Sequence, residues 1–304
     1  MPESLVLLWE PAWPCPVEQV WAASKRGLGD PTYRIQDGRH WRALNTPSGP
    51  ATLAVRPLGA DGVVRAEAWG PGAARALALL PAMLGALDDP SGFRPAHPLV
   101  AELHRRRPHW RLARTASVWD ALVPVVLEQK VTGQEATFAI RSLLARHGSP
   151  APGPGAGLGL RTFPGPDVVR LIPSWEWLRM HVDPARSSTL VRAAAVAGTL
   201  ERVLPADPGR ADERLRSIVG VGVWTSAEVR GRALGDADAV SFGDYHVPAD
   251  LGWALAGEPV DDAGLAELLE PYRPHRLRVQ RLVTMAGISR PRRGPRLESR
   301  AHLP

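Results

Sequence analysis

The hydrophobic pattern of this chain changes near residue 98, and that change limits the folds it can adopt. Before residue 98, short apolar runs are separated by Pro, Gly and Asp, which is typical of strands joined by turns. The predicted strands include Leu5–Trp9, Thr52–Arg56 and Gly62–Ala66, and the predicted helices are Val17–Ala23 and Ala73–Leu87. We therefore expect a small α+β domain over residues 1–98, with an antiparallel sheet and helices packed on it.

After residue 98, apolar residues recur with helical periodicity, which predicts an all-α second domain over residues 99–288. The expected helical segments are Val118–His147, Pro166–Leu178, Ser187–Leu204, Ala211–Ile218, Trp224–Leu234, Ala263–Leu269 and Arg276–Ala286. Within this domain Gly148–Gly159 is so rich in Gly and Pro that it predicts a mobile loop without regular structure. Residues 289–304 predict a basic, disordered tail.

Composition narrows the class of protein. The chain has 304 residues, 44% of them hydrophobic, which is enough for two packed cores. Its formal net charge of +6 is carried by arginine, because Lys25 and Lys130 are the only lysines. This charge fits a polyanionic partner, although a coding sequence rich in G and C would also raise the arginine content. Cys15 is the only cysteine, so the sequence excludes an internal disulfide and a four-cysteine iron–sulfur cluster.

The amino terminus and the longest apolar runs bear on location. The first apolar run, Leu5–Trp9, is short and follows an acidic residue, so we do not expect a signal peptide. No stretch approaches the ~20 apolar residues that a membrane-spanning helix requires. We expect a cytoplasmic monomer that does not contact membranes.

Two glycines separate the end of one predicted helix from the start of the next. Gly220 and Gly222 lack Cβ atoms, so they can take positive φ angles and let a ligand approach the backbone. The helix that follows offers unpaired N–H groups and the positive end of its dipole, which suits a phosphate oxygen. Such contacts would fix the register of the protein on a nucleic acid without reading its sequence. An ordinary turn between two helices would look the same, and this alternative stays open.

Three blocks in this order resemble a known group of enzymes: Val118–Ala136 with a Gln-bearing turn, the glycine hairpin with Trp224 and Thr225, and a loop with Asp244 and Tyr245. They resemble the helix-hairpin-helix DNA glycosylase superfamily and, within it, the 3-methyladenine DNA glycosylase II family. Phe163–Pro166 and Pro184–Leu190 also resemble the spacers of that family. The likeness covers about residues 99–288, while the first 98 residues resemble the family's sheet domain weakly.

The resemblance implies a monofunctional DNA glycosylase of base excision repair that acts at the nucleoid on double-stranded DNA with damaged bases. It implies that Asp244 is the catalytic carboxylate for hydrolysis of alkylated purines of the 3-methyladenine type after base flipping. The chemistry agrees, because breaking an N-glycosidic bond builds positive charge on the sugar, and a carboxylate stabilises that charge and can orient or deprotonate water. Asp244 could instead cap a short helix or turn.

The resemblance also implies the residues that surround the reacting sugar. Trp224 and Tyr245 would line the base pocket, where an electron-rich indole favours a cationic alkylated purine. Trp224 could instead belong to the core. The residues expected to contact DNA are Gly220, Gly222, Val223, Thr225, Gln129 and Lys130. At the turn where relatives insert an apolar wedge, Lys130 departs from the pattern, and a solvated turn is the alternative there. Where some relatives have a second pocket tryptophan, this chain has Val283 and Thr284.

The sequence also bears on cofactors and on strand cleavage. The resemblance implies a monovalent cation held by the backbone carbonyls of Arg216, Ile218 and Val221. We expect no organic cofactor, and His- or Cys-rich metal spacing and a Gly-Lys phosphate loop are absent from the sequence. Trp224 occupies the place of the lysine that bifunctional relatives use to form a Schiff base, so we expect no lyase activity.

Two other classes of protein stay open at this point. One is a non-catalytic helix-hairpin-helix protein that binds DNA but has lost the chemistry of its pocket. The other is an all-helical protein whose basic face meets RNA or an acidic protein. Release of damaged bases would separate the first from an enzyme, and a steep salt dependence on duplex DNA would argue against the second.

Overall fold

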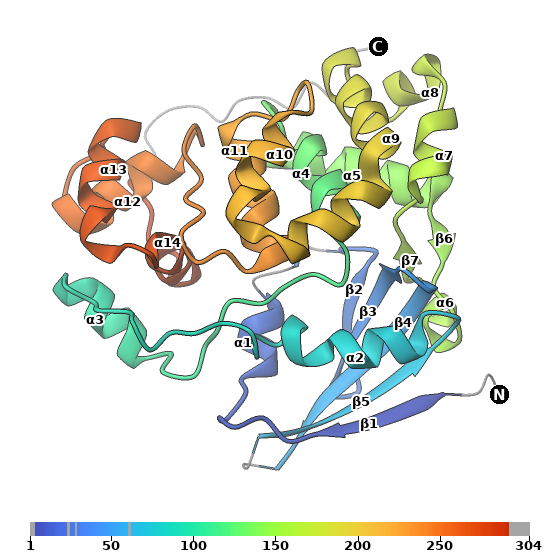
Figure 1. Ribbon diagram of the computed structural model, residues 1–304, viewed down its shortest axis with the longest axis horizontal. Helices are drawn as coiled ribbons and strands as arrows, with labels where there is room; N and C mark the ends of the chain where they lie inside the picture. Colours follow the sequence, from blue (N-terminus) through green and yellow to red (C-terminus); the bar gives the residue numbers. More distant parts are fainter. Residues whose placement is uncertain (1–3, 23–24, 28, 60–61, 292–304) are drawn as a thin grey trace.

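The computed structural model describes residues 4–22, 25–27, 29–59 and 62–291, and Figure 1 shows a sheet covered by helices. Its five antiparallel strands lie in the order β1-β5-β4-β3-β2. The strands are β1 Leu5–Trp9, β2 Tyr33–Gln36, β3 Arg39–Thr46, β4 Gly49–Leu58 and β5 Val63–Trp69. This sheet and the helices beyond it confirm the expected α+β class.

Strands β2 and β3, which the apolar pattern did not predict, are joined by a two-residue hairpin. Asp37 and Gly38 form this turn with φ angles of 52° and 66°. Two successive positive φ angles are the geometry that matches the twist of an antiparallel pair, and Asp-Gly is a favoured sequence for it. The register Gln36 to Arg39 follows directly from that turn.

One face of the sheet is covered by helices α1 Val17–Ala22 and α2 Ala73–Met83. Trp21 of α1 is fully buried, and its indole N–H donates to the carbonyl of Met83 at 3.0 Å. Leu77 and Leu80 of α2 pack in the same cluster as the inward side chains of the central strands. The hydrophobic face of the sheet is thus closed by local helices, as the sequence predicts.

The Gly- and Pro-rich segment 148–159 covers the opposite face of the sheet, so the prediction of a mobile, structureless loop was wrong. It contains β6 Ser149–Pro150, which pairs with β7 Arg161–Thr162, and the short helix α6 Pro154–Gly157. Ala151 and Leu160 are buried against the stacked rings of Trp41 and Trp69. The glycines permit close approach, because a Cβ at Gly153 would lie 2.8 Å from the Cβ of Trp69.

The helical part begins with α3 Pro98–Arg105 and continues through a series of short helices around two long ones. The others are α4 Val118–Leu127, α5 Gly133–His147, α7 Pro166–Leu171, α8 Ser174–Arg179, α9 Pro184–Ala206, α10 Ala211–Arg216, α11 Val223–Val229, α12 Val247–Ala256, α13 Asp262–Leu269 and α14 Arg276–Met285. A π-helical turn, Arg230–Leu234, continues α11, and 3-10 turns occupy Pro208–Arg210 and Glu270–Tyr272. Helices α3 and α12 lay outside the segments expected from periodicity.

Helix α4 lies at the centre of the helical part, and Asp120 is its only charged residue. Its residues Ala121 to Leu127 are buried, and they pack among α5, α9 and α11. Full burial of each such leucine or valine contributes about 1.5–3 kcal/mol. The expected helix Val118–His147 is broken after α4, where Lys130 takes a φ of 52°. Thr132 then begins α5 with a capping box that includes Glu135.

Polar contacts connect the sheet to the helices. The backbone N–H and the side-chain amide of Asn45 on β3 donate to the carboxylate of Asp120 on α4, at 2.8 and 2.9 Å. Arg278 on α14 is 1% exposed and binds Asp88, in the loop after α2, at 2.6 Å.

A division at residue 98 and a disordered tail from residue 289 stay predictions, and residues 292–304 lie outside the described residues. No described helix is long and apolar enough to cross a membrane.

Candidate functional site

The glycine hairpin joins α10 to α11, and its two glycines differ in role. Gly220 has a φ of 100°, and a Cβ there would lie 2.9 Å from the Cβ of Thr189 on α9. Gly222 has a φ of −92° and a ψ of −174°, which any residue can adopt, and a Cβ there would meet nothing within 4 Å. A positive φ therefore applies to Gly220 and not to Gly222. Gly220 is required for close packing on α9, while Gly222 leaves an open surface.

The side chains around the hairpin divide into exposed aliphatic groups and buried polar ones. Val219 and Val223 are 68% and 46% exposed. Thr225 is 2% exposed, and its hydroxyl oxygen accepts from the side-chain amide of Gln129 at 2.7 Å. The same amide nitrogen donates to the carbonyl of Gly220 at 3.0 Å. The side chains of Gln129 and Thr225 therefore brace the turn itself, so a DNA contact at Thr225 would fall to its backbone N–H.

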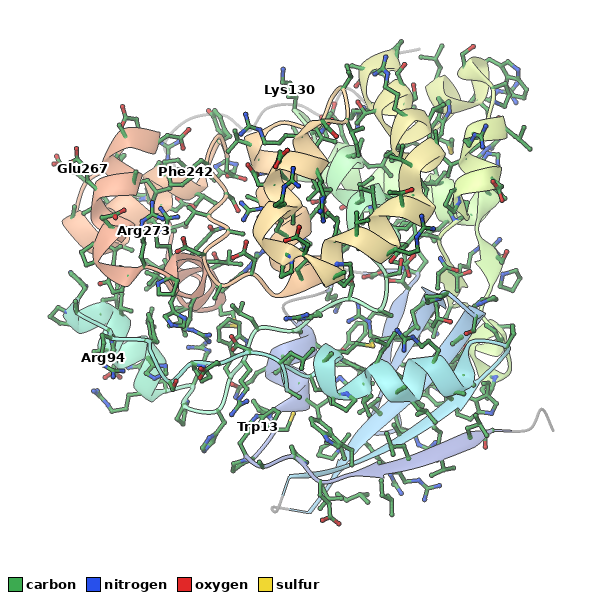
Figure 2. The ribbon with its side chains drawn as sticks, viewed as in Figure 1. Trp13, Arg94, Lys130, Phe242, Glu267 and Arg273 are labelled. Carbon is green, nitrogen blue, oxygen red and sulfur yellow. The ribbon has the colours of Figure 1, made fainter. Side chains whose placement is uncertain are left out.

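Lys130 follows Gln129 on the turn between α4 and α5. Its side chain is exposed, and Figure 2 shows it projecting from the edge of the helical part, away from the sheet. The bond from Gln129 to Gly220 brings this turn next to the hairpin. The structure thus places the turn with Gln129 and Lys130 next to the glycine hairpin, and both segments were predicted to contact DNA.

The carboxylate of Asp244 is held by three donors from two sides. The indole N–H of Trp224 donates to its Oδ2 at 3.0 Å. The backbone N–H groups of His246 and Val247 donate to its Oδ1 at 2.7 and 3.0 Å. Asp244 is partly buried, as is Trp224. Asp244 therefore braces the start of α12, as the capping alternative predicts, and its bond from Trp224 holds it beside the hairpin.

Trp224 is both packed and polar. Its ring contacts the core of the helical part, while its N–H reaches Asp244. Tyr245 is 75% exposed, and its ring stands edge-on to that of His246 at 4.9 Å. In this conformation Tyr245 lies on the surface, and its place in a base pocket stays a prediction.

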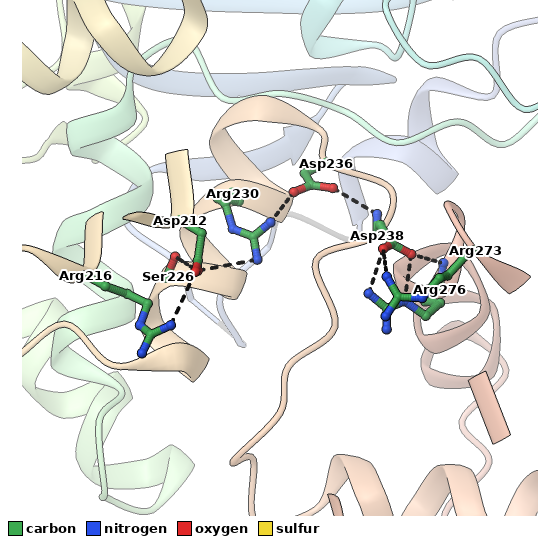
Figure 3. Close-up of polar contacts among 8 residues, drawn as sticks. All are labelled: Asp212, Arg216, Ser226, Arg230, Asp236, Asp238, Arg273 and Arg276. Carbon is green, nitrogen blue, oxygen red and sulfur yellow. Dashed lines mark hydrogen bonds and ion pairs between the residues drawn. The ribbon is translucent and has the colours of Figure 1, made fainter. Parts of the chain in front are cut away.

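A chain of ionic contacts frames the hairpin and the segment that leads to Asp244 (Figure 3). Asp212 on α10 accepts from the hydroxyl of Ser226 on α11 at 2.7 Å. Arg230, at the end of α11, pairs with Asp236, which in turn accepts from the N–H of Asp238. Asp238 binds Arg276 of α14 at 2.6 Å. These contacts join α10 to α11, and they join the segment that follows α11 to both the end of α11 and α14.

The comparisons with known proteins agree with this arrangement. No family model matches the chain. The chain is 30% identical over 189 residues to the "Probable bifunctional transcriptional activator/DNA repair enzyme AlkA" of Mycobacterium tuberculosis, a match that covers 60% of this chain and 36% of that relative. The 3-methyladenine DNA glycosylase of Archaeoglobus fulgidus superposes with a TM-score of 0.73 at 16% identity, covering 91% of this chain and 97% of that one. At 16% identity, this likeness shows that the two chains share a fold.

A solved structure named for a different activity shares the same fold. The Clostridium acetobutylicum 8-oxoguanine glycosylase/lyase in its apo form superposes with a TM-score of 0.68 at 11% identity, over 94% of this chain and 98% of that one. At this identity the likeness concerns the fold alone. The match to the Mycobacterium relative spans about a third of that protein's length.

Sequence reasoning missed the residues that anchor the Asp244 loop. Ser241 is fully buried and bonds to both Glu228 on α11 and Gln280 on α14. The backbone N–H of Gly243 donates to both carboxylate oxygens of Asp262, at 2.9 and 3.1 Å. One signal was available, since Glu228 follows Trp224 by one helical turn and so shares its helix face.

Burial and charge act in opposite directions on Glu228. Burial alone raises the pKa of this carboxyl, but Arg232, Arg281 and the Ser241 hydroxyl outweigh it and hold the pKa well below its usual range. Glu228 is therefore ionised, and it is bonded to the loop that carries Asp244 through the Ser241 hydroxyl. Arg232 binds it at 2.7 Å and Arg281 at 3.4 Å.

A cavity lies elsewhere, between the sheet and the helices. Arg42, Arg114 and Arg281 line it, and so does Asp120. Burial raises the pKa of Asp120 to about 6, against the opposing effect of its bonds from Asn45. Asp244 and Trp224 do not line this cavity, so it is not the expected base pocket.

The described residues contain no group of three or more His, Cys, Asp and Glu side chains that could hold a metal ion. The predicted cation ligands are backbone carbonyls, which such groups do not include. Of these, the carbonyl of Ile218 accepts from the N–H of Val221 at 2.9 Å and keeps a second lone pair. The cation site on the carbonyls of Arg216, Ile218 and Val221 stays a prediction.

Proposed function

We propose that this protein is a monofunctional DNA glycosylase that hydrolyses the N-glycosidic bond of alkylated purines in double-stranded DNA. The observation that carries the proposal is the position of Asp244, a partly buried residue whose carboxylate is bonded to Trp224, and Trp224 lies just after the glycine hairpin. The sequence likeness to AlkA adds support. We further propose that the protein works as a cytoplasmic monomer at the nucleoid, and that residues 1–98 form a separate domain.

In this proposal the hairpin grips the DNA backbone near the damaged nucleotide. The N–H groups of Val223, Trp224 and Thr225 open α11 and have no partner within the helix, so they can face a phosphate. Exposed Val219 and Val223 permit close contact with the sugar-phosphate backbone. A monovalent cation on the carbonyls of Arg216, Ile218 and Val221 would add positive charge beside that phosphate. Lys130, on the neighbouring turn, would contact a phosphate or fill the gap left by the extruded nucleotide.

The chemistry needs one carboxylate at the flipped nucleotide. As the bond to the base breaks, positive charge grows on the deoxyribose, and Asp244 would stabilise it and orient the attacking water. Trp224 and the two backbone donors leave this carboxylate little freedom, so its direction is set before substrate binds. The indole face would favour a cationic alkylated purine by about 1–2 kcal/mol.

The absence of lyase activity is part of the proposal. A lyase of this superfamily needs an amine that forms a Schiff base with the sugar. The position that would supply it holds Trp224, and Lys130 is the only lysine after residue 25. We expect base excision to leave an abasic site with the strand intact.

The direct experiment incubates the purified protein with methylated duplex DNA and measures released bases by chromatography. We expect release of 3-methyladenine with intact strands on a denaturing gel. Tight DNA binding without release would contradict the proposal and support the non-catalytic alternative. A strand cut at the abasic site would contradict the absence of lyase activity.

A further inference from the structure

The loop that carries Asp244 is anchored to the protein by one buried serine. The Ser241 hydroxyl donates to Glu228 on α11 at 2.5 Å and accepts from the side-chain amide of Gln280 on α14 at 2.8 Å. Its backbone N–H donates to the side-chain oxygen of Gln280 at 3.1 Å. Ser241, Glu228 and Gln280 are 0%, 5% and 2% exposed. The hydroxyl and the backbone N–H of Ser241 are therefore both hydrogen-bonded to residues of these two helices.

This anchor closes a ring with the bond between Trp224 and Asp244. Glu228 follows Trp224 by one turn on α11, and Ser241 precedes Asp244 by three residues on the loop. The two side-chain bonds, one at each end, tie the same helix face to the same loop segment. Phe242, next to Ser241, lies on the coil between α11 and the pair α12–α13 (Figure 2). Loss of either bond would leave one side-chain hydrogen bond between residues 241–244 and α11.

A polar anchor at this place is not explained by stability. Replacing buried polar networks with apolar side chains of similar volume is often neutral or stabilising, whereas hydrogen bonds set direction and register. Glu228 also stays charged through Arg232 and Arg281, so its oxygen is an acceptor at neutral pH. The anchor therefore supplies geometry, three residues from the proposed catalytic group.

We propose that Ser241 is a positioning residue, which sets the register of the Asp244 loop against α11 and α14 through Glu228 and Gln280. This inference rests on the proposed function for its catalytic consequence. The structural claim, that Ser241 sets the register of the loop, does not depend on whether the protein has this activity.

The test compares Ser241→Ala with Thr52→Val, which removes an equally buried hydroxyl from the sheet, where it donates to the carbonyl of Pro152 at 2.6 Å. Three quantities are measured: the single-turnover rate of base release, the Kd for duplex DNA with a tetrahydrofuran abasic analogue, and amide hydrogen exchange over residues 242–247. For Ser241→Ala we expect a fall in rate of at least about 10-fold, as for loss of an orienting contact, with a Kd within about 2-fold. Exchange at His246 and Val247 should quicken, because their N–H groups bond to the carboxylate of Asp244.

Gln280→Met gives a second variant in case Ser241→Ala does not fold. It keeps the volume of the side chain and removes both bonds to Ser241, so we expect the same pattern. If the two residues act through one anchor, the double variant loses less than the product of the single losses. Thr52→Val should leave rate and loop exchange unchanged even if it lowers the Tm as much.

Two results in the Ser241 and Gln280 variants would overturn the proposal. One is loop exchange in both variants at the wild-type rate, and the other is a wild-type rate of release in Ser241→Ala. If wild type releases no base, the proposed function fails, and hydrogen exchange alone still decides whether Ser241 holds the loop. Equal slowing by Thr52→Val would show that any loss of a buried hydroxyl has this effect, which would also overturn the role of Ser241.

Discussion

The indole N–H of Trp224 donates a hydrogen bond to Oδ2 of Asp244 at 3.0 Å, across 20 residues of sequence. The tryptophan that opens the helix after the hairpin thereby orients the carboxylate on the following loop. This bond gives Trp224 a role beyond the wall of a base pocket. It also explains why an indole suits this position, because phenylalanine and leucine have no donor.

Trp224→Phe keeps an aromatic ring and removes the donor to Asp244. Loss of a hydrogen bond to a charged group costs about 1.5–3 kcal/mol, so we expect the rate of base release to fall roughly 10- to 100-fold. Single-turnover kinetics on DNA with 3-methyladenine measures the change. An unaltered rate would show that the bond does not orient the carboxylate in the reacting complex.

Gly220→Ala and Gly222→Ala form a matched pair. We expect Gly220→Ala to lower the Tm by several degrees, since 1 kcal/mol corresponds to about 2–4 °C in a chain of this size. The cause is a φ of 100° together with a clash against Thr189. Gly222→Ala should unfold like wild type, because its backbone is extended and its surroundings are open. Calorimetry of both variants decides, and equal Tm values would contradict the assigned difference.

Lys130→Gln tests the turn beside the hairpin. If Lys130 contacts one phosphate, the slope of log Kd against log salt should flatten by about 0.9 for duplex DNA. Arg94→Gln removes the same charge from an exposed site that lies far from Lys130 (Figure 2), so its slope should match wild type. Fluorescence anisotropy at several salt concentrations measures both. Identical slopes for Lys130→Gln and wild type would remove Lys130 from the contact surface.

The pH dependence of stability tests the buried carboxyl of Asp120. Its pKa of about 6 in the fold lies above the ordinary ~3.9, so the folded state holds this proton more tightly than the unfolded chain. Its contribution to stability is therefore present below about pH 4 and is lost as the pH rises toward 6, by up to about 2–3 kcal/mol. Urea denaturation should show the unfolding free energy of wild type falling relative to Asp120→Asn across that interval. A difference that is flat or rises with pH would contradict the burial assigned to this carboxyl.

Several parts of the fold followed from local sequence, and others could not. Leu5–Trp9 was predicted with its observed bounds, since turn residues flank a short apolar run. The hairpin at Asp37 and Gly38 carried a recognisable signal that the search for apolar runs passed over. Segment 148–159 was wrongly predicted to lack regular structure. Gly153 in this segment allows close packing on Trp69, and no local pattern reveals a partner so distant in sequence.

The candidate site shows the same division. The order of hairpin, Trp224 and Asp244 could be predicted, because each lies in a short motif. The anchor at Ser241 could not, since Glu228 and Gln280 belong to different helices that only the fold brings together. The brace from Gln129 to Thr225 was likewise hidden, although both residues were nominated.

The central claim is that Asp244 breaks the bond between sugar and base, and Asp244→Asn tests it most directly. Asparagine has nearly the same shape and keeps an oxygen for the N–H groups of His246 and Val247, but it loses the negative charge. With wild type measured in parallel on methylated duplex DNA, we expect base release to disappear while the Kd for the DNA changes by less than about 3-fold. Release at the wild-type rate by Asp244→Asn would contradict the account.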